Sequence, residues 1–164
     1  MFSHNIYNIE QIGNKITFLF KGSCQDAATC RQHIKNKTES YMIDQVTFFT
    51  NQSCHTEEDL AKRFGLLVPD QSDEMTGTLN ITGPKLVMCS DIKKLSFIYD
   101  MPLVYLKENE QLHCQLTMKK GCGDMHQKWN PVSAITFCEI EYNVFKFNFE
   151  LIGLLSWEDI LKQL

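Results

Sequence analysis

The sequence predicts an α+β fold, because short alternating strands open and close the chain and helical segments lie between them. Of the 164 residues, 43% are apolar and 22% are charged. This composition is typical of a globular protein and excludes a disordered or collagen-like chain. The formal net charge of −4 has the wrong sign for gripping nucleic acid through phosphate contacts, so any link to nucleic acid is expected to be indirect.

The first elements are a strand and a helix. Residues 15–21 alternate apolar and polar side chains, as a half-buried strand does. Asp26 is expected to cap the helix that follows. The apolar stripe of that helix has members three and four residues apart: Ala27, Cys30 and Ile34.

A second strand and helix follow in the middle of the chain. Residues 41–51 are rich in β-branched and aromatic side chains, which favours a strand. Thr56 and Asp59 form an Asp variant of the capping box and predict a helix start. The apolar stripe of this helix contains Leu60, Phe64 and Leu67. Residues 77–120 are predicted to form turns and strands. Apolar and polar side chains alternate most clearly over residues 112–118.

The last third of the chain returns to strands. The parity of the apolar positions changes between Phe137 and Ile140, which predicts a β-bulge between them and a reversal of the inward face. Alternation then continues over residues 145–151. Ser156 is expected to cap a terminal helix over residues 157–164.

The seven cysteines are scattered and contain no Cys-x-x-Cys pair. They predict reduced, mostly buried thiols and argue against a disulfide framework or structural zinc. The start of the chain lacks the pattern of a secretory signal, and no apolar run reaches membrane-spanning length. We therefore expect an intracellular chain, cytoplasmic or nuclear, without a membrane partner.

Two kinds of chemistry are conceivable around Cys122 and His126. With His113 and Cys114 they suggest a metal cluster, but zinc requires three or four convergent ligands at tighter spacing. A nucleophilic Cys122–His126 pair lacks an orienting third group and an oxyanion site. We expect no metal, no cofactor and no catalytic residue.

One segment gathers cations around an aromatic side chain on a chain that is acidic overall. Its members are Lys119, Lys120, His126, Lys128 and Trp129. They are expected either to form a solvated hairpin tip or to form a docking surface, since protein interfaces are enriched in aromatic anchors. The pattern alone leaves both interpretations open.

Three blocks follow one another along the chain: TFLFKGSCQDAATCR, which ends at Arg31, then IDQVTFFTNQSCHTEEDLAKRFGLLVP, which contains Arg63, and then TGPKLVMCSDI. Taken in this order, they resemble the α-like assembly subunit of DNA-directed RNA polymerases, the archaeal D subunit and its eukaryotic third-largest counterpart. The first block resembles the strand of these subunits followed by a helix with an Asn-Ala-Leu-Arg-Arg core. The second is similar to their strand, Asn-x-Ser turn and acidic helix, with Arg63 at a matching position, and the third resembles one of their hairpins.

The most specific block is KKGCGDMHQKWNPV, which reproduces the family signature Lys-Gly-x-Gly-x-x-His-x-Lys-Trp-x-Pro. The matching residues are Lys120, Gly121, Gly123, His126, Lys128, Trp129 and Pro131. The cysteine-rich zinc loop and the iron–sulphur insertions of the family have no counterpart, and the terminal helix is short. These departures favour a divergent lineage, such as a viral or extrachromosomal polymerase, in which case the chain is expected in a virion as well.

The resemblance implies an RNA polymerase α-like two-lobed fold, with a discontinuous pairing lobe (1–41 and 137–164) and an inserted β-rich lobe (42–136). It implies a non-catalytic platform that pairs with a smaller α-like subunit, as a heterodimer rather than a homodimer, and docks the large β-like and β′-like subunits. The expected partner surface contains Ala27, Cys30, Arg31, Ile34, Arg63, Lys120, Gly121, Gly123, His126, Lys128, Trp129, Ile160, Leu161 and Leu164. The alternative is a free-standing protein-binding module with the same fold.

Overall fold

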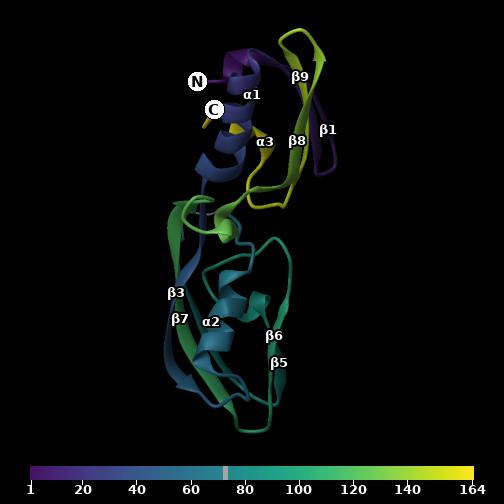
Figure 1. Ribbon diagram of the computed structural model, residues 1–164. Coiled ribbons are helices and arrows are strands. Elements are labelled where there is room, and N and C mark those ends of the chain that lie inside the picture. The colour runs from purple at the N-terminus through teal and green to yellow at the C-terminus, as the bar shows by residue number, and fades with distance from the viewer. Residues whose placement is uncertain (72–73) are drawn as a thin grey trace. The chain divides into compact units, whose positions relative to one another are not determined.

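A computed structural model of the chain describes residues 1–71 and 74–164 and confirms the α+β class. The chain forms two compact units, shown in Figure 1: Met1–Ser40 together with Gly121–Leu164, and Tyr41–Lys120. The chain leaves the first unit along β3 (Glu39–Asn51) and returns to it along β7 (Gln111–Cys122). The first unit is therefore discontinuous in sequence.

The chain passes between the two units twice, and the second of these boundaries differs from the predicted one. Residues 121–136 belong to the first unit and not to the inserted lobe. Val132 and Ile135 are only 3% and 5% exposed and lie in the core of the first unit. Val132 also pairs with Leu151 at the start of an antiparallel ladder. Strand pairing and core packing thus hold this segment in the first unit.

A four-stranded antiparallel sheet in the order β1-β2-β9-β8 forms the first unit. Its strands are β1 (Ile6–Ile12), β2 (Lys15–Lys21), β8 (Val132–Glu141) and β9 (Val144–Leu151). The helical elements include α1 (Cys24–Gln32), a π-helical turn (His33–Lys37) and α3 (Trp157–Leu161), together with short 3₁₀ turns at Ser3–Asn5 and Gln127–Trp129.

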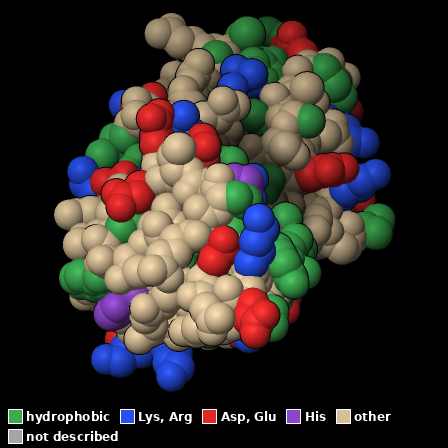
Figure 2. Space-filling model, turned by 90° about the horizontal axis from the view of Figure 1, so that it is seen from below, with side chains coloured by type: hydrophobic (Ala, Val, Ile, Leu, Met, Phe, Trp, Pro, Cys, Tyr) green, Lys and Arg blue, Asp and Glu red, His purple; other side chains and the backbone are tan. Residues whose placement is uncertain are grey.

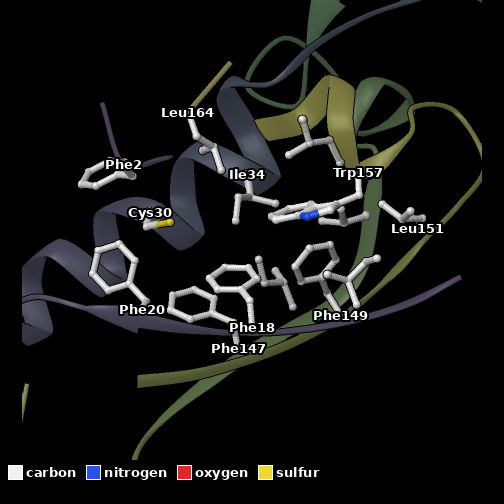
Figure 3. Packing of buried hydrophobic residues seen from close by; sticks show 14 of the residues in the cluster. Phe2, Phe18, Phe20, Cys30, Ile34, Phe147, Phe149, Leu151, Trp157 and Leu164 are labelled. Carbon is white, nitrogen blue, oxygen red and sulfur yellow. The ribbon is translucent and has the colours of Figure 1, made fainter. Parts of the chain in front are cut away.

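The core of the first unit lies between the sheet and these helices (Figure 3). The Phe18 ring stacks on Phe147 and Trp157, with centroid separations of 4.7 and 5.4 Å. Phe18, Phe147 and Trp157 are each at most 3% exposed. The apolar side chains that alternate along residues 15–21 and 145–151 therefore form the inward face of this sheet, as predicted.

Several details of the first unit differ from prediction. Ser23, not Asp26, is the N-cap of α1, and Asp26 completes the capping box as the third helical residue. Register shifts in β8 lie at Ser133/Thr136 and Glu139/Glu141. Ile140 stays 48% exposed, so the expected reversal of the inward face near Cys138 is wrong. The strand ends shortly afterwards at Glu141, where the hairpin turn leads into β9.

The second unit contains a three-stranded sheet in the order β3-β7-β4 and a separate two-stranded sheet of β5 and β6. Their bounds are β4 (Thr76–Thr82), β5 (Lys85–Met88) and β6 (Pro102–Leu106). The hairpin expected around TGPKLVMCSDI is not formed, because β4 pairs with β7 and β5 pairs with β6. Helix α2 (Glu57–Gly65) completes the unit.

The core of the second unit follows the predicted stripes. Thr56 caps α2 by accepting a hydrogen bond from the Asp59 N–H at 3.2 Å. Leu60 and Phe64 are fully buried. The predicted inward face of β7 is also buried, namely Leu112, Cys114, Leu116 and Met118. Along the described parts of the chain, no helix has the length and apolarity needed to span a bilayer.

Candidate interaction surfaces

The signature block KKGCGDMHQKWNPV contains a loop, called the signature loop below, that runs from Gly121 to Pro131. This loop folds around Trp129, which is only 3% exposed. Gly121, at the end of β7, lies directly against the indole ring. A Cβ added at Gly121 would come within 2.5 Å of a ring carbon of Trp129. The Trp129 carbonyl also accepts a hydrogen bond from the Ser40 hydroxyl at 3.3 Å. The glycine and the tryptophan of the signature are therefore a packed pair.

The second glycine of the signature positions the loop against the end of the first helical segment. A Cβ at Gly123 would lie 2.6 Å from the Lys35 carbonyl oxygen. The Asp124 N–H donates to the Asn36 carbonyl at 3.1 Å, and the Asp124 carboxylate pairs with Lys37. This ion pair raises the pKa of the Lys37 amine. Gly123 thus allows a close backbone approach that any side chain would prevent.

The polar signature residues are more accessible than the tryptophan. His126 is exposed, and its Nδ1 accepts a hydrogen bond from the Lys128 N–H at 3.0 Å. The Lys128 ammonium lies 4.4 Å from the centre of the Trp129 ring, a cation–π contact. Lys120 is exposed and belongs to the second unit. Trp129 and Gly121 are buried, so the structure corrects their assignment to a partner surface: both maintain the fold of the loop.

The apolar stripe predicted to face a partner lies inside the first unit instead. Its buried members, at most 3% exposed, are Ala27, Cys30, Ile34, Ile160 and Leu164. Figure 3 shows Cys30, Ile34 and Leu164 directed towards the aromatic side chains of the sheet. A side chain enclosed in this way offers no surface to another chain. The apolar stripe of the helices covers the inward face of the sheet and buries its aromatic side chains.

The remaining helix residues are partly accessible. Leu161 is half-buried at the edge of the same core. Arg31 is half-buried, and its Nε donates to the Ile135 carbonyl at 3.1 Å. Arg31 and Lys35 line a polar pocket of about 290 Å³ beside β8. Arg31 thus ties α1 to the bulged part of β8.

Arg63 is the one predicted site residue on the second unit besides Lys120. It is exposed, and its Nη1 donates to the Leu103 carbonyl at 2.6 Å. Arg63 also borders a pocket of about 280 Å³ with apolar walls, which include Leu66, Tyr99 and Met101. Sequence reasoning missed this pocket, because its walls come from two segments more than thirty residues apart whose contact no local pattern signals.

All seven cysteines are free, but they are not mostly buried as predicted. Cys24, Cys54 and Cys138 are exposed and Cys122 is half-buried. Burial raises the pKa of the Cys30 and Cys114 thiols to about 12. Within residues 1–71 and 74–164, no three His, Cys, Asp or Glu side chains lie close enough to hold a metal ion.

The surface charge is mixed. In the face shown in Figure 2, Lys and Arg side chains are interspersed with Asp and Glu side chains. Several are close pairs, such as Lys62 with Glu58 at 2.9 Å and Lys85 with Asp91 at 2.5 Å. Two local features stand out on this mixed surface, namely the signature loop and the Arg63 pocket.

The chain is 26% identical over 162 residues to DNA-directed RNA polymerase subunit Rpo3 of Methanocaldococcus jannaschii, a match that covers 93% of this chain and 84% of that protein. It is 30% identical over 135 residues to Rpo3 of Methanobrevibacter smithii, covering 68% of this chain and 48% of that protein. A conjugation stage-specific protein of Tetrahymena thermophila is 29% identical over 117 residues, covering 60% of this chain and 37% of that protein.

The chain therefore spans about half or less of the length of the latter two relatives. No family model matches the sequence.

Proposed function

This chain is a divergent member of the α-like subunit family of DNA-directed RNA polymerases, and from that premise we propose that it is a non-catalytic assembly subunit. In this role it pairs with a smaller α-like subunit and docks the large β-like and β′-like subunits. It makes no chemical contribution to RNA synthesis and contacts nucleic acid only through its partners. Such a subunit works inside the cell.

The observation that carries this proposal is the extent of the match to the Rpo3 subunit of M. jannaschii. It covers 93% of the chain, so both compact units lie largely within it. The signature loop supports the same conclusion. Its two glycines and its tryptophan meet packing requirements of this loop, because Gly121 lies against Trp129 and Gly123 lies against the Lys35 backbone.

The pairing surface has to be placed on residues that another chain can reach. Since the apolar stripe of α1 is buried, we place the pairing surface on the opposite, exposed side of this helix. That side carries Gln25, Ala28, Thr29 and Gln32. The large subunits are expected to contact the basic side chains of the loop, His126 and Lys128 on the first unit, together with Lys120 on the second.

Affinity capture tests the proposal. The full chain, carrying a terminal tag, is expressed in its source cells and captured, and the recovered proteins are quantified by mass spectrometry. We expect two large polymerase subunits and one smaller α-like subunit in amounts equal to the chain. Recovery of the chain alone, or with proteins other than polymerase subunits, would support a free-standing binding module and reject the assembly role.

A further inference from the structure

The apolar pocket beside Arg63 lies within the second unit, where α2 ends and the chain approaches β6. Its walls come from Arg63, Leu66 and Leu67 on one side and from Tyr99, Met101 and Leu103 on the other. Leu67 and Leu103 are 5% and 2% exposed, so they form its inner wall. The volume of about 280 Å³ is close to the lower limit of ordinary ligand pockets and suits one bulky side chain.

The rim of this pocket exposes more apolar surface than the fold requires. Leu66 is 71% exposed, Met101 is 49% exposed and Tyr99 is 48% exposed. Leu66 is the C-cap of α2, and ending a helix does not require an apolar side chain at this position. Ile98, next to Tyr99, is 45% exposed as well. Adjacent exposed apolar side chains around a pocket mark a binding site more often than scattered ones do.

A fixed positive charge stands at the edge of this apolar surface. The hydrogen bond from Arg63 Nη1 to the Leu103 carbonyl holds the guanidinium beside the pocket. Among the described residues, no carboxylate forms an ion pair with Arg63, whereas the neighbouring Lys62 pairs with Glu58. A guanidinium has five N–H donors, and a single carbonyl uses only one of them. The remaining donors suit a carboxylate, which accepts two parallel hydrogen bonds from arginine.

The acidic residue within the rim segment is already engaged. Asp100 lies between Tyr99 and Met101 in the chain, and its carboxylate accepts hydrogen bonds from the N–H and the hydroxyl of Ser90, each at 3.1 Å. These bonds lower the pKa of the Asp100 carboxyl and hold it in a neighbouring pocket. The Arg63 pocket therefore combines an apolar cavity with a cation that has no acidic partner within residues 1–71 and 74–164.

We propose that this pocket binds a short segment of another polymerase subunit, in which a bulky aliphatic or aromatic side chain fills the cavity and an adjacent Asp or Glu pairs with Arg63. The inference rests on the proposed function, because it takes the partner from the polymerase complex. The rim residues contribute apolar contact, and Arg63 sets the orientation of the segment. Leu66 and Arg63 then act together, one through burial and the other through charge.

Site-specific crosslinking in the assembled complex tests the contact directly. A photo-reactive phenylalanine analogue replaces Leu66 in the tagged full chain, the captured complex is irradiated, and the crosslinked peptide is sequenced by mass spectrometry. The matched control places the same analogue at Tyr105, which is 55% exposed on β6 and does not line the pocket. We expect Leu66 to crosslink to a peptide of another subunit with an apolar residue next to Asp or Glu, and Tyr105 not to crosslink to that peptide.

Two substitutions measure the energetic role. Leu66→Asp and Arg63→Glu are each expected to weaken association with the partner subunit roughly tenfold to a hundredfold, as the loss of one buried leucine or one charge-assisted pair does. Lys62→Glu, a charge reversal at the next position, is the control and is expected to leave association unchanged. Because Leu66 is largely exposed, Leu66→Asp tests the pocket without disturbing the core.

The outcomes separate this inference from the proposed function. If the wild-type chain captures no polymerase subunits, the proposed function fails. If it captures them but Leu66→Asp and Arg63→Glu capture them equally well, the pocket inference alone fails. Crosslinks from Leu66 to a second copy of this chain, or to no protein, would also overturn it.

Discussion

The contact between Gly121 and Trp129 predicts a strong energetic coupling that a double-mutant cycle measures. Gly121→Ala places a methyl group 2.5–2.9 Å from three atoms of the indole ring. Overpacking of this kind destabilises a fold by about 1–3 kcal/mol. Trp129→Ala removes a buried aromatic side chain and is expected to destabilise by about 3–5 kcal/mol. In the Trp129→Ala background the new methyl group meets an empty space, so Gly121→Ala is expected to be nearly neutral.

The cycle therefore predicts a coupling free energy of about 1–3 kcal/mol between the two positions. Urea unfolding of the four proteins measures it, with circular dichroism and tryptophan fluorescence as probes. Trp157 is present in all four proteins and lies in the core of the first unit, so its emission reports on the unit that contains the loop. Additive effects of the two substitutions would refute the packing of Gly121 against Trp129. If Trp129→Ala leaves the free energy of unfolding unchanged, Trp129 does not stabilise the fold and its role lies on the surface.

Two further predictions concern the core of the first unit and the thiols. Ile34→Ala is expected to lower the free energy of unfolding of the isolated chain by about 2–5 kcal/mol, because Ile34 is fully buried; no change in urea unfolding would mean that Ile34 serves a partner and not this core. At about pH 8, a thiol reagent is expected to label Cys24, Cys54 and Cys138 in the native chain, as mapped by mass spectrometry. A pKa raised to about 12 keeps the buried Cys30 and Cys114 protonated at that pH, so both should react only after unfolding; rapid native labelling of either would contradict their burial.

Strands and helices with one buried face were predictable from local pattern. The alternation in β2, β7 and β9 and the stripe of α2 correspond to inward faces in the structure. Strand β1 was missed because its residues are almost all exposed and it carries no alternating pattern. The N-cap of α1 was misplaced because Ser23 and Asp26 are both good caps, and only the geometry of the capping box assigns their roles.

The candidate site was harder to predict. A sequence pattern shows which side chains are apolar, but it does not show whether the same chain or a partner packs on them. The stripe of Ala27, Cys30 and Ile34 has the same spacing whether it faces a partner or its own sheet. The sheet of the first unit is strongly aromatic, and its own helices cover it. Trp129 shows the same ambiguity, since a tryptophan among cations suits both an interface and a packed loop. The Arg63 pocket depends on tertiary contact between distant segments and has no local signature.

The most direct test of the assembly role is reconstitution of the polymerase from its separate subunits with and without this chain. The purified large subunits and the smaller α-like subunit are mixed, and the complexes are resolved by analytical ultracentrifugation. We expect one complex containing all subunits when the full chain is present, and separate large subunits when it is omitted. If the large subunits assemble equally well without the chain, its role as an assembly subunit is contradicted.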